Sequence, residues 1–205
     1  MILHPSYFID VVSLIHVFHC EELTFEKQDS YVKQTYRNRC YIAAANGKLA
    51  LNIPIIHQKK GGSVPYHSIE IDHSQSWHVQ HLKSIKSAYR SSPYYDYYED
   101  DLQSLFKELP DSLLEWNLKT FNWCMDQLQI DQQFDFTTAY IDDPLAKTLI
   151  TAKSNPVFQP DQYMQVFQEK HGFISNLSAL DLIFNLGPSS RVYLKSQEYH
   201  LERPF

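Results

Sequence analysis

The chain has 205 residues, of which 43% are hydrophobic and 20% charged, so it can bury a sizeable core and its composition excludes disorder. A formal net charge of −6 at pH 7 argues against broad binding to nucleic acid, which requires a basic surface. Four polar residues interrupt the apolar beginning of the chain, namely His4, Asp10, His16 and His19. Because no basic segment precedes them, we expect neither a signal peptide nor a membrane span.

The three cysteines, Cys20, Cys40 and Cys124, stand apart from one another in the sequence. An odd number of cysteines outside any CxxC arrangement is typical of reduced thiols in a cytoplasmic protein. We therefore expect a cytoplasmic location.

The chain is expected to begin with a strand, a helix and a second strand. Residues 1–4 predict a short buried strand that Pro5 ends, and Ser6 is placed to cap the next segment. From Phe8 onward, apolar residues recur at helical spacing, at Val11, Val12, Ile15 and Phe18. Residues 23–26 predict the second strand.

The next segment carries the strongest local signal in the sequence, a β-hairpin. Its predicted turn is Asn46-Gly47, because both central residues of such a turn must tolerate positive φ. With that turn, Ile42 lies opposite Leu51, and one face of the hairpin is apolar apart from Asn38. The other face collects Arg37, Arg39, Tyr41 and Asn52.

Two cations on one face suit an anionic ligand, because guanidinium groups bind carboxylate or phosphate through paired, planar hydrogen bonds. We therefore expect Arg37 and Arg39 to line a site. Asn38 is expected to orient a substrate amide or hydroxyl, although the register places it on the opposite face, where it would support the hairpin from beneath. Lys33 adds a further cation just upstream. The alternative is that both arginines face water and form weak surface ion pairs.

The rest of the chain alternates between loops, helices and strands. Residues 57–68 predict a mobile loop, and 69–71 and 134–141 predict strands. Helical patterns cover 76–90, 94–109, 113–128, 160–170 and 178–186, the last capped by Ser178 and ended by Gly187-Pro188. We therefore expect one domain over residues 1–205, of class α/β or α+β. A small mixed sheet with a β-hairpin would be flanked by several helices.

Two further places in the sequence combine a histidine with other polar groups. His81 lies at the edge of the apolar face of the helix over 76–90, where an imidazole would suit acid–base catalysis. The alternative is a half-buried histidine bonded to a backbone carbonyl. His4 and Tyr7 lie at a strand-to-helix corner, where α/β proteins often bind anions, although this corner could equally be a capped turn.

The familiar metal and nucleotide signatures are absent from the sequence. His16 and His19 are three residues apart, as are His78 and His81, but neither pair has a companion ligand at a recognised spacing. No P-loop, GxGxxG, GxSxG or HExxH motif occurs. We expect no metal site, and the sequence leaves the cofactor open.

Several segments in collinear order resemble the WbqC-like family. They are HPSYF, YVKQTYRNRCYI with its following NG turn and LNIPI, WHVQHLKSIKSAYRSSPYYDYYEDDL, and NLSALDLIFNLG. The resemblance covers most of the chain. It points to Arg37, Asn38, Arg39, His81, Ser87, Ala88, Tyr89, Pro93, Asn176, Ser178 and Asp181 as the residues that carry the family pattern.

The resemblance implies a bacterial cytoplasmic protein whose relatives often lie among surface-polysaccharide (O-antigen type) genes, and it implies little chemistry. We expect an enzyme, a transferase or ligase, that adds a small group to an amino sugar or sugar nucleotide. His81 would move a proton, and Tyr89, Ser178 and Asp181 would contribute to binding. Two alternatives remain: a non-catalytic protein that binds a phosphorylated or nucleotide-linked ligand or a partner enzyme, and arginines held in buried structural ion pairs. The oligomeric state is open.

Overall fold

A computed structural model describes residues 1–56, 64–153 and 155–198. Residues 57–63, most of the loop predicted to be mobile, lie outside this part. The elements are β1 (Ile2–Leu3), α1 (Val11–His19), β2 (Leu23–Phe25), β3 (Arg39–Ala44), β4 (Gly47–Asn52), η1 (Tyr66–Ser68), α2 (Trp77–Tyr89), α3 (Tyr95–Leu105), α4 (Leu113–Leu128), β5 (Phe134–Phe136), α5 (Pro144–Ile150), α6 (Gln168–His171), α7 (Ala179–Leu186), η2 (Gly187–Ser189) and α8 (Ser190–Ser196).

Three short strands form a parallel sheet in the order β1-β2-β5. Leu3 pairs with Phe25, and Phe25 pairs in turn with Phe136, so the three strands end side by side. The helix α1 connects β1 to β2, as a parallel pair requires. Together with the separate hairpin, this sheet confirms the predicted mixed class of α and β elements.

The strands β3 and β4 form the predicted hairpin, but its turn lies one residue earlier than predicted. Ala44 pairs with Gly47, so Ala45 and Asn46 are the central residues. Only Gly47 takes a positive φ, of 101°, whereas the predicted turn required positive φ at both Asn46 and Gly47. Ile42 therefore pairs with Leu49, a shift of two residues that keeps every side chain on its predicted face.

The first helix begins later than predicted, and a different residue caps it. Asp10, rather than Ser6, occupies the N-cap position of α1. Its carboxylate accepts hydrogen bonds from the backbone nitrogen and the hydroxyl of Ser13, at 3.1 and 2.7 Å. Asp10 thereby satisfies a backbone donor that the first turn of a helix otherwise leaves free.

The helices α2, α3 and α4 lie where the apolar periodicity predicted them. The helix predicted over 160–170 is wrong, because helical structure there is limited to Gln168–His171. Helices α5 and α8 were not predicted from the sequence. In α5 the cap is Asp143, whose carboxylate accepts a hydrogen bond from the Ala146 backbone nitrogen at 2.8 Å. Ser178 precedes α7 as predicted, but its side chain makes no capping bond.

Two predicted strands are shorter in the structure than in the prediction. Residues 69–71 form isolated bridges, to Ile55 and to Ser112, in place of a strand. The strand predicted over 134–141 ends at Phe136.

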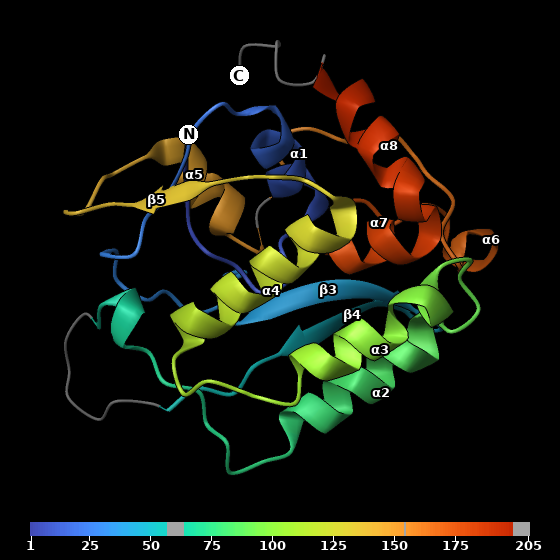
Figure 1. Cartoon of the computed structure of the whole chain (residues 1–205), viewed down its shortest axis with the longest axis horizontal. Helices are drawn as coiled ribbons and strands as arrows, with labels where there is room; N and C mark the ends of the chain where they lie inside the picture. The colour runs from blue at the N-terminus through green and yellow to red at the C-terminus, as the bar shows by residue number, and fades with distance from the viewer. Residues whose placement is uncertain (57–63, 154, 199–205) are drawn as a thin grey trace.

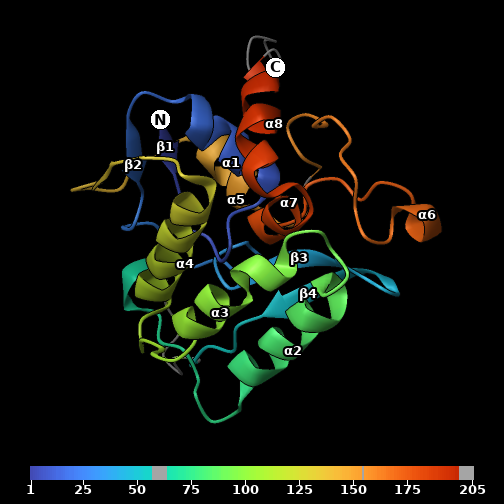
Figure 2. The same cartoon turned by 45° about the vertical axis from the view of Figure 1, so that its right-hand side comes forward.

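The helix α4 runs across the middle of the molecule, in front of the hairpin (Figure 1). It packs against α3 and α7, while α2 packs against β3. After a 45° turn the hairpin is seen between α7 on one side and α2 on the other (Figure 2). One cluster of buried apolar side chains extends from Leu3 to Leu194. None of the described helices combines the length and the hydropathy needed to cross a membrane.

Candidate functional site

The carboxyl ends of the three parallel strands bring polar residues together. His4 follows β1, Glu26 follows β2 and Thr137 follows β5. Backbone bonds from Glu26 to Leu3 (2.8 Å) and from Thr137 to Phe25 (3.0 Å) hold these ends in line. In α/β proteins, ligands commonly bind just beyond the carboxyl ends of parallel strands. The carboxyl edge of this sheet is therefore the candidate binding site.

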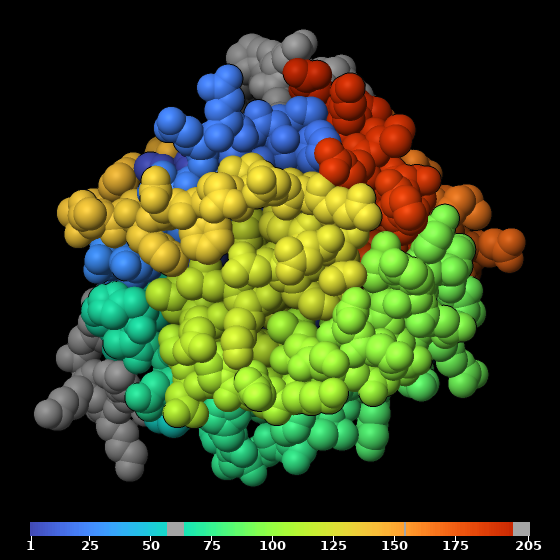
Figure 3. All heavy atoms as spheres, in the orientation of Figure 1, coloured from blue at the N-terminus to red at the C-terminus, as the bar shows by residue number. Residues whose placement is uncertain are grey.

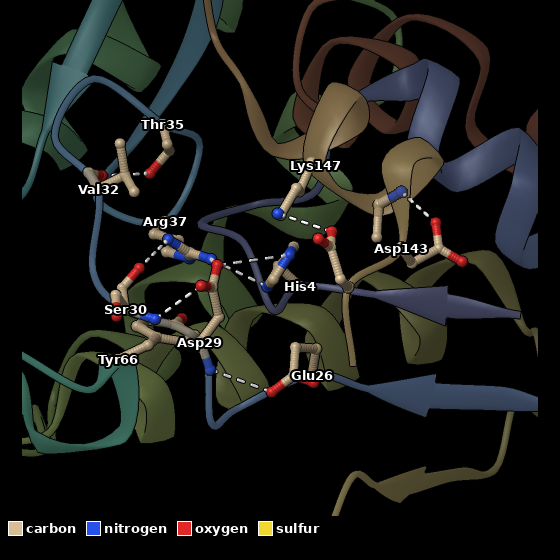
Figure 4. A network of polar contacts seen from close by, with 12 residues as sticks. His4, Glu26, Asp29, Ser30, Val32, Thr35, Arg37, Tyr66, Asp143 and Lys147 are labelled. Carbon is tan, nitrogen blue, oxygen red and sulfur yellow. Dashed lines mark hydrogen bonds and ion pairs between the residues drawn. The ribbon is translucent and has the colours of Figure 1, made fainter. Parts of the chain in front are cut away.

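A buried ion pair between Arg37 and Asp29 lies at this edge (Figure 4). The Arg37 Nη2 atom is 2.5 Å from Asp29 Oδ2 and 3.0 Å from His4 Nδ1. Its Nη1 atom donates to the Ser30 carbonyl at 3.1 Å. The guanidinium carbon lies 5.0 Å from the centre of the Tyr66 ring, a cation–π distance. The Arg37 side chain is 1% exposed and that of Asp29 14% exposed, so Asp29 is the member of the pair that solvent reaches.

The contact with Arg37 fixes the protonation of His4. A guanidinium only donates hydrogen bonds, so His4 Nδ1 must accept, and the proton of the neutral ring resides on Nε2. Burial and the nearby Arg37 charge lower the pKa of His4 to about 4, although Asp29 acts in the opposite direction. At neutral pH, His4 is therefore a neutral ring whose Nε2 lies 3.8 Å from Asp29 Oδ2.

Glu26 orders the loop that carries Asp29. It is fully buried, and its Oε1 atom accepts from the backbone nitrogens of Gln28 (2.5 Å) and Asp29 (3.1 Å). Its Oε2 atom accepts from the Ile141 nitrogen at 2.8 Å, which ties in the segment after β5. Glu26 and Asp29 were not predicted as site residues. The available signal was an acidic residue directly after a short apolar strand.

Asn117 connects this edge to α4. Its Nδ2 atom donates to the Arg37 carbonyl at 2.6 Å and to the Tyr66 hydroxyl at 2.7 Å. Tyr66 in turn donates to the Pro5 carbonyl at 2.9 Å. These contacts hold two backbone segments in place, one at Pro5 and one at Arg37 itself.

The two hairpin arginines do not share a surface, which corrects the prediction. Arg37 precedes β3 and is fully buried, whereas Arg39 begins β3, pairs with Asn52 and is partly exposed. Strand alternation does not apply to Arg37, because it lies in a turn. Asn38 closes the base of the hairpin: its carbonyl accepts from the Ile53 nitrogen and its Nδ2 atom donates to the Ile53 carbonyl. Lys33 is exposed in the preceding turn.

His81 faces the core rather than the edge of α2, and its two ring nitrogens are both engaged. Its Nε2 atom lies 3.1 Å from the Asn52 carbonyl, which can only accept, so Nε2 carries the proton. Its Nδ1 atom therefore accepts from the Tyr7 hydroxyl at 2.9 Å. Burial lowers the pKa of His81 to about 4. Tyr7 is likewise fully buried, and these contacts match the alternative of a histidine bonded to a carbonyl.

Tyr89 and Asp181 belong to a second buried cluster, where the end of α2 meets α7. Asp181 accepts hydrogen bonds from the hydroxyls of Tyr89 (2.8 Å) and Tyr163 (2.7 Å) and from Gln165 Nε2 (2.8 Å). All three donors are uncharged, and burial raises the pKa of Asp181 to about 6. Ser178 lies nearby and donates its backbone N–H to the Tyr41 carbonyl. Tyr163 and Gln165 were not predicted to belong to a site.

We expect Tyr89→Phe to lower the free energy of unfolding by about 1–2 kcal/mol, because it leaves a buried carboxylate oxygen without one of its donors. It also removes the acceptor of the Ala43 backbone nitrogen. Urea denaturation measures the change. The control is Tyr97→Phe, at a ring that is 77% exposed. Equal effects of the two changes would contradict a structural role of the Tyr89 hydroxyl.

Within the described ranges, no three His, Cys, Asp or Glu side chains gather as a metal ion would require. Of the histidine pair on α1, His19 contacts the Leu194 carbonyl through Nε2 at 2.9 Å, and His16 packs against the Phe158 ring.

No curated protein and no solved structure matches the sequence. The model of the WbqC-like protein family matches residues 14–154, a range that contains Glu26, Asp29, Arg37 and His81. This range covers more than half of the chain, so the protein belongs to the WbqC-like protein family, as its motifs predicted.

Proposed function

We propose that this protein is an enzyme of bacterial surface-glycan synthesis that transfers or ligates a small group onto an amino sugar or a sugar nucleotide. The observation that carries the proposal is the convergence of His4, Glu26 and the Arg37–Asp29 pair just beyond three parallel strands. A buried charge pair at this place is costly to form for stability alone, so a role in binding gives a reason for it.

The difference in exposure between Arg37 and Asp29 assigns their roles in this proposal. Arg37 is enclosed and holds the Asp29 carboxylate in one orientation. Asp29 would accept hydrogen bonds from a sugar hydroxyl or amino group, whereas His4, whose side chain is 2% exposed, would help to hold Arg37 and Asp29 in place. The anionic part of the ligand would then meet Lys33 and Arg39, which retain exposed surface.

One observation favours a second candidate, a non-catalytic protein that binds a phosphorylated or nucleotide-linked sugar. His81, the predicted acid–base group, is enclosed with both ring nitrogens hydrogen-bonded inside the protein. A proton-transfer group must reach the substrate within hydrogen-bond distance or through one water. In this alternative, binding occurs at the same edge and no bond is made or broken.

Mass spectrometry of the native protein, followed by calorimetric titration with uridine diphosphate N-acetylglucosamine, tests the proposal. We expect a co-purifying amino sugar or sugar nucleotide.

We also expect the double variant Lys33→Ala, Arg39→Gln to weaken binding about tenfold or more, through loss of two cations. The control is Lys195→Ala, at an exposed lysine on α8. Unchanged binding in the double variant would contradict the site. Binding without any change in the mass of the sugar, on incubation with acyl and amino donors, would favour the non-catalytic alternative.

A further inference from the structure

A groove with a volume of about 360 Å³ lies where α3, the end of α4 and the start of α8 meet. Its tyrosine side is formed by Tyr94, Tyr97 and Tyr98, and its polar side includes Asp126, Gln129 and Arg191. The three elements meet on the face of the molecule displayed in Figure 3, to the right of its centre. The volume falls within the range of small-molecule sites, which combine an apolar lining with a few convergent polar groups.

The tyrosine side of the groove is held in place by its neighbours. The Tyr94 ring lies against Gly187, where an added Cβ atom would be 2.6 Å from the ring. Gly187 also has a positive φ of 51°. Both this backbone conformation and the close approach of the Tyr94 ring require a residue without a Cβ atom. The Tyr97 ring is 77% exposed and makes an edge contact, at 4.8 Å between centroids, with the buried ring of Tyr98. The Tyr97 ring is therefore open to solvent on one side and packed against the buried Tyr98 ring on the other.

The polar side of the groove disfavours an anion. It is built on the last turn of α4, where the dipole of a 16-residue helix places partial negative charge. Asp126 adds a full negative charge there. The Arg191 Nη1 atom donates to the Gln129 carbonyl, so part of its hydrogen-bonding capacity is already used by α4. Arg191 in turn disfavours a compact cation. Hydrogen-bond donors and acceptors are both present, which suits a neutral ligand with several hydroxyl groups.

We infer that this groove binds an uncharged pyranose ring of a glycan. The apolar C–H face of the ring packs on Tyr97 and Tyr94, because an aromatic ring offers a flat apolar surface of matching size. Asp126 and Gln129 accept hydrogen bonds from the hydroxyls, and Arg191 donates one. The groove is separate from the carboxyl-edge site. Asn117 and Gln129, which mark the two places on α4, are about 18 Å apart along a helix axis.

Saturation-transfer NMR with the methyl glycosides of glucose, galactose and N-acetylglucosamine tests the inference. We expect transfer to the ring protons of at least one glycoside, with a dissociation constant of about 1–10 mM, which is typical of one small ligand on an open surface. Tyr97→Ala should weaken this binding about tenfold, whereas Tyr97→Phe, which keeps the ring, should stay within about twofold. Val192→Ala, an exposed neighbour of Arg191, is the control for surface changes on α8.

Three results would overturn the inference. The first is the absence of transfer to every cyclic glycoside at about 20 mM, well above the expected dissociation constant. The second is equal transfer to sorbitol, which has the hydroxyls but no ring. The third is full binding in both Tyr97→Ala and Arg191→Ala.

Binding of tetramethylammonium in place of the glycosides would instead assign the tyrosines to a cation cage. The double variant at Lys33 and Arg39 leaves this groove intact, so failure here is distinguishable from failure at the carboxyl edge.

Discussion

Replacing Asp29 with asparagine is expected to lower the free energy of unfolding by about 3–5 kcal/mol, the usual effect of breaking a buried ion pair from one side. The Arg37 side chain is 1% exposed, so water cannot take the place of the lost carboxylate around its guanidinium group. An asparagine oxygen would still accept a hydrogen bond from Nη2, but it carries no charge to offset the guanidinium. The desolvation cost of Arg37 would then be uncompensated.

Urea denaturation at pH 7 measures this loss of stability. Two further variants show whether the loss comes from the unpaired charge of Arg37. Asp135→Asn is the matched control, because Asp135 is an exposed aspartate on the neighbouring strand β5 and should change stability by less than about 0.5 kcal/mol. The double variant Asp29→Asn, Arg37→Met removes both charges and should be more stable than the sum of the two single losses indicates. A loss below about 0.5 kcal/mol for Asp29→Asn would show that Arg37 does not depend on this carboxylate.

The elements that were predicted correctly are those with a strong local pattern. Helix α4 begins and ends at the predicted residues, because apolar side chains recur along it at helical spacing and Ser112 caps it through the Glu115 nitrogen. The hairpin was predicted because Gly47 marks a turn between two apolar runs. Its register was wrong by two residues because the single glycine was assigned to the second central position of the turn.

The candidate site depended on contacts that no local pattern contains. His4 and Arg37 were both predicted as site residues, and the structure brings them to 3.0 Å. Their partner Asp29 was missed, because its position depends on the loop that Glu26 orders after β2. His81 was placed at the edge of an amphipathic helix, whereas α2 packs against the hairpin on that side and encloses the ring. Burial on more than one side of a helix cannot be read from one apolar stripe.

Acidification from pH 7 to pH 4 is expected to remove about 6 kcal/mol from the free energy of unfolding. Burial lowers the pKa values of His4, His16 and His81 to about 4 in the folded protein, against about 6.5 in an unfolded chain. Between these values the unfolded state binds more protons, so stability rises with pH in this window and is lost as pH falls through it. Each histidine contributes about 3 kcal/mol by this linkage.

Asp181 opposes the histidines over part of the same window. Its pKa is raised by burial to about 6, so the folded state holds this proton more tightly than the unfolded state does. Its contribution is fully present below about pH 4 and is lost as pH rises through about 6, a change of about 3 kcal/mol in the opposite direction. Asp10, whose pKa burial also raises, acts in the same sense. The three histidines outweigh the aspartates, so net stability should fall on acidification.

Urea denaturation at several pH values between about 4.5 and 7.5 tests this balance through the slope of stability against pH. The variant His16→Phe should reduce the net slope by about half, since it removes one of three similar histidine contributions while the opposing contribution of Asp181 remains. It should cost little stability at pH 7, because His16 Nε2 is buried and bonds to none of the described residues, and the ring already packs on Phe158. Asp181→Asn should make the slope steeper, because it removes the opposing group. A slope that is flat in the wild type, or unchanged in both variants, would mean that these buried groups do not control acid stability. Val192→Ala, exposed and without a titrating group, should leave the slope as it is.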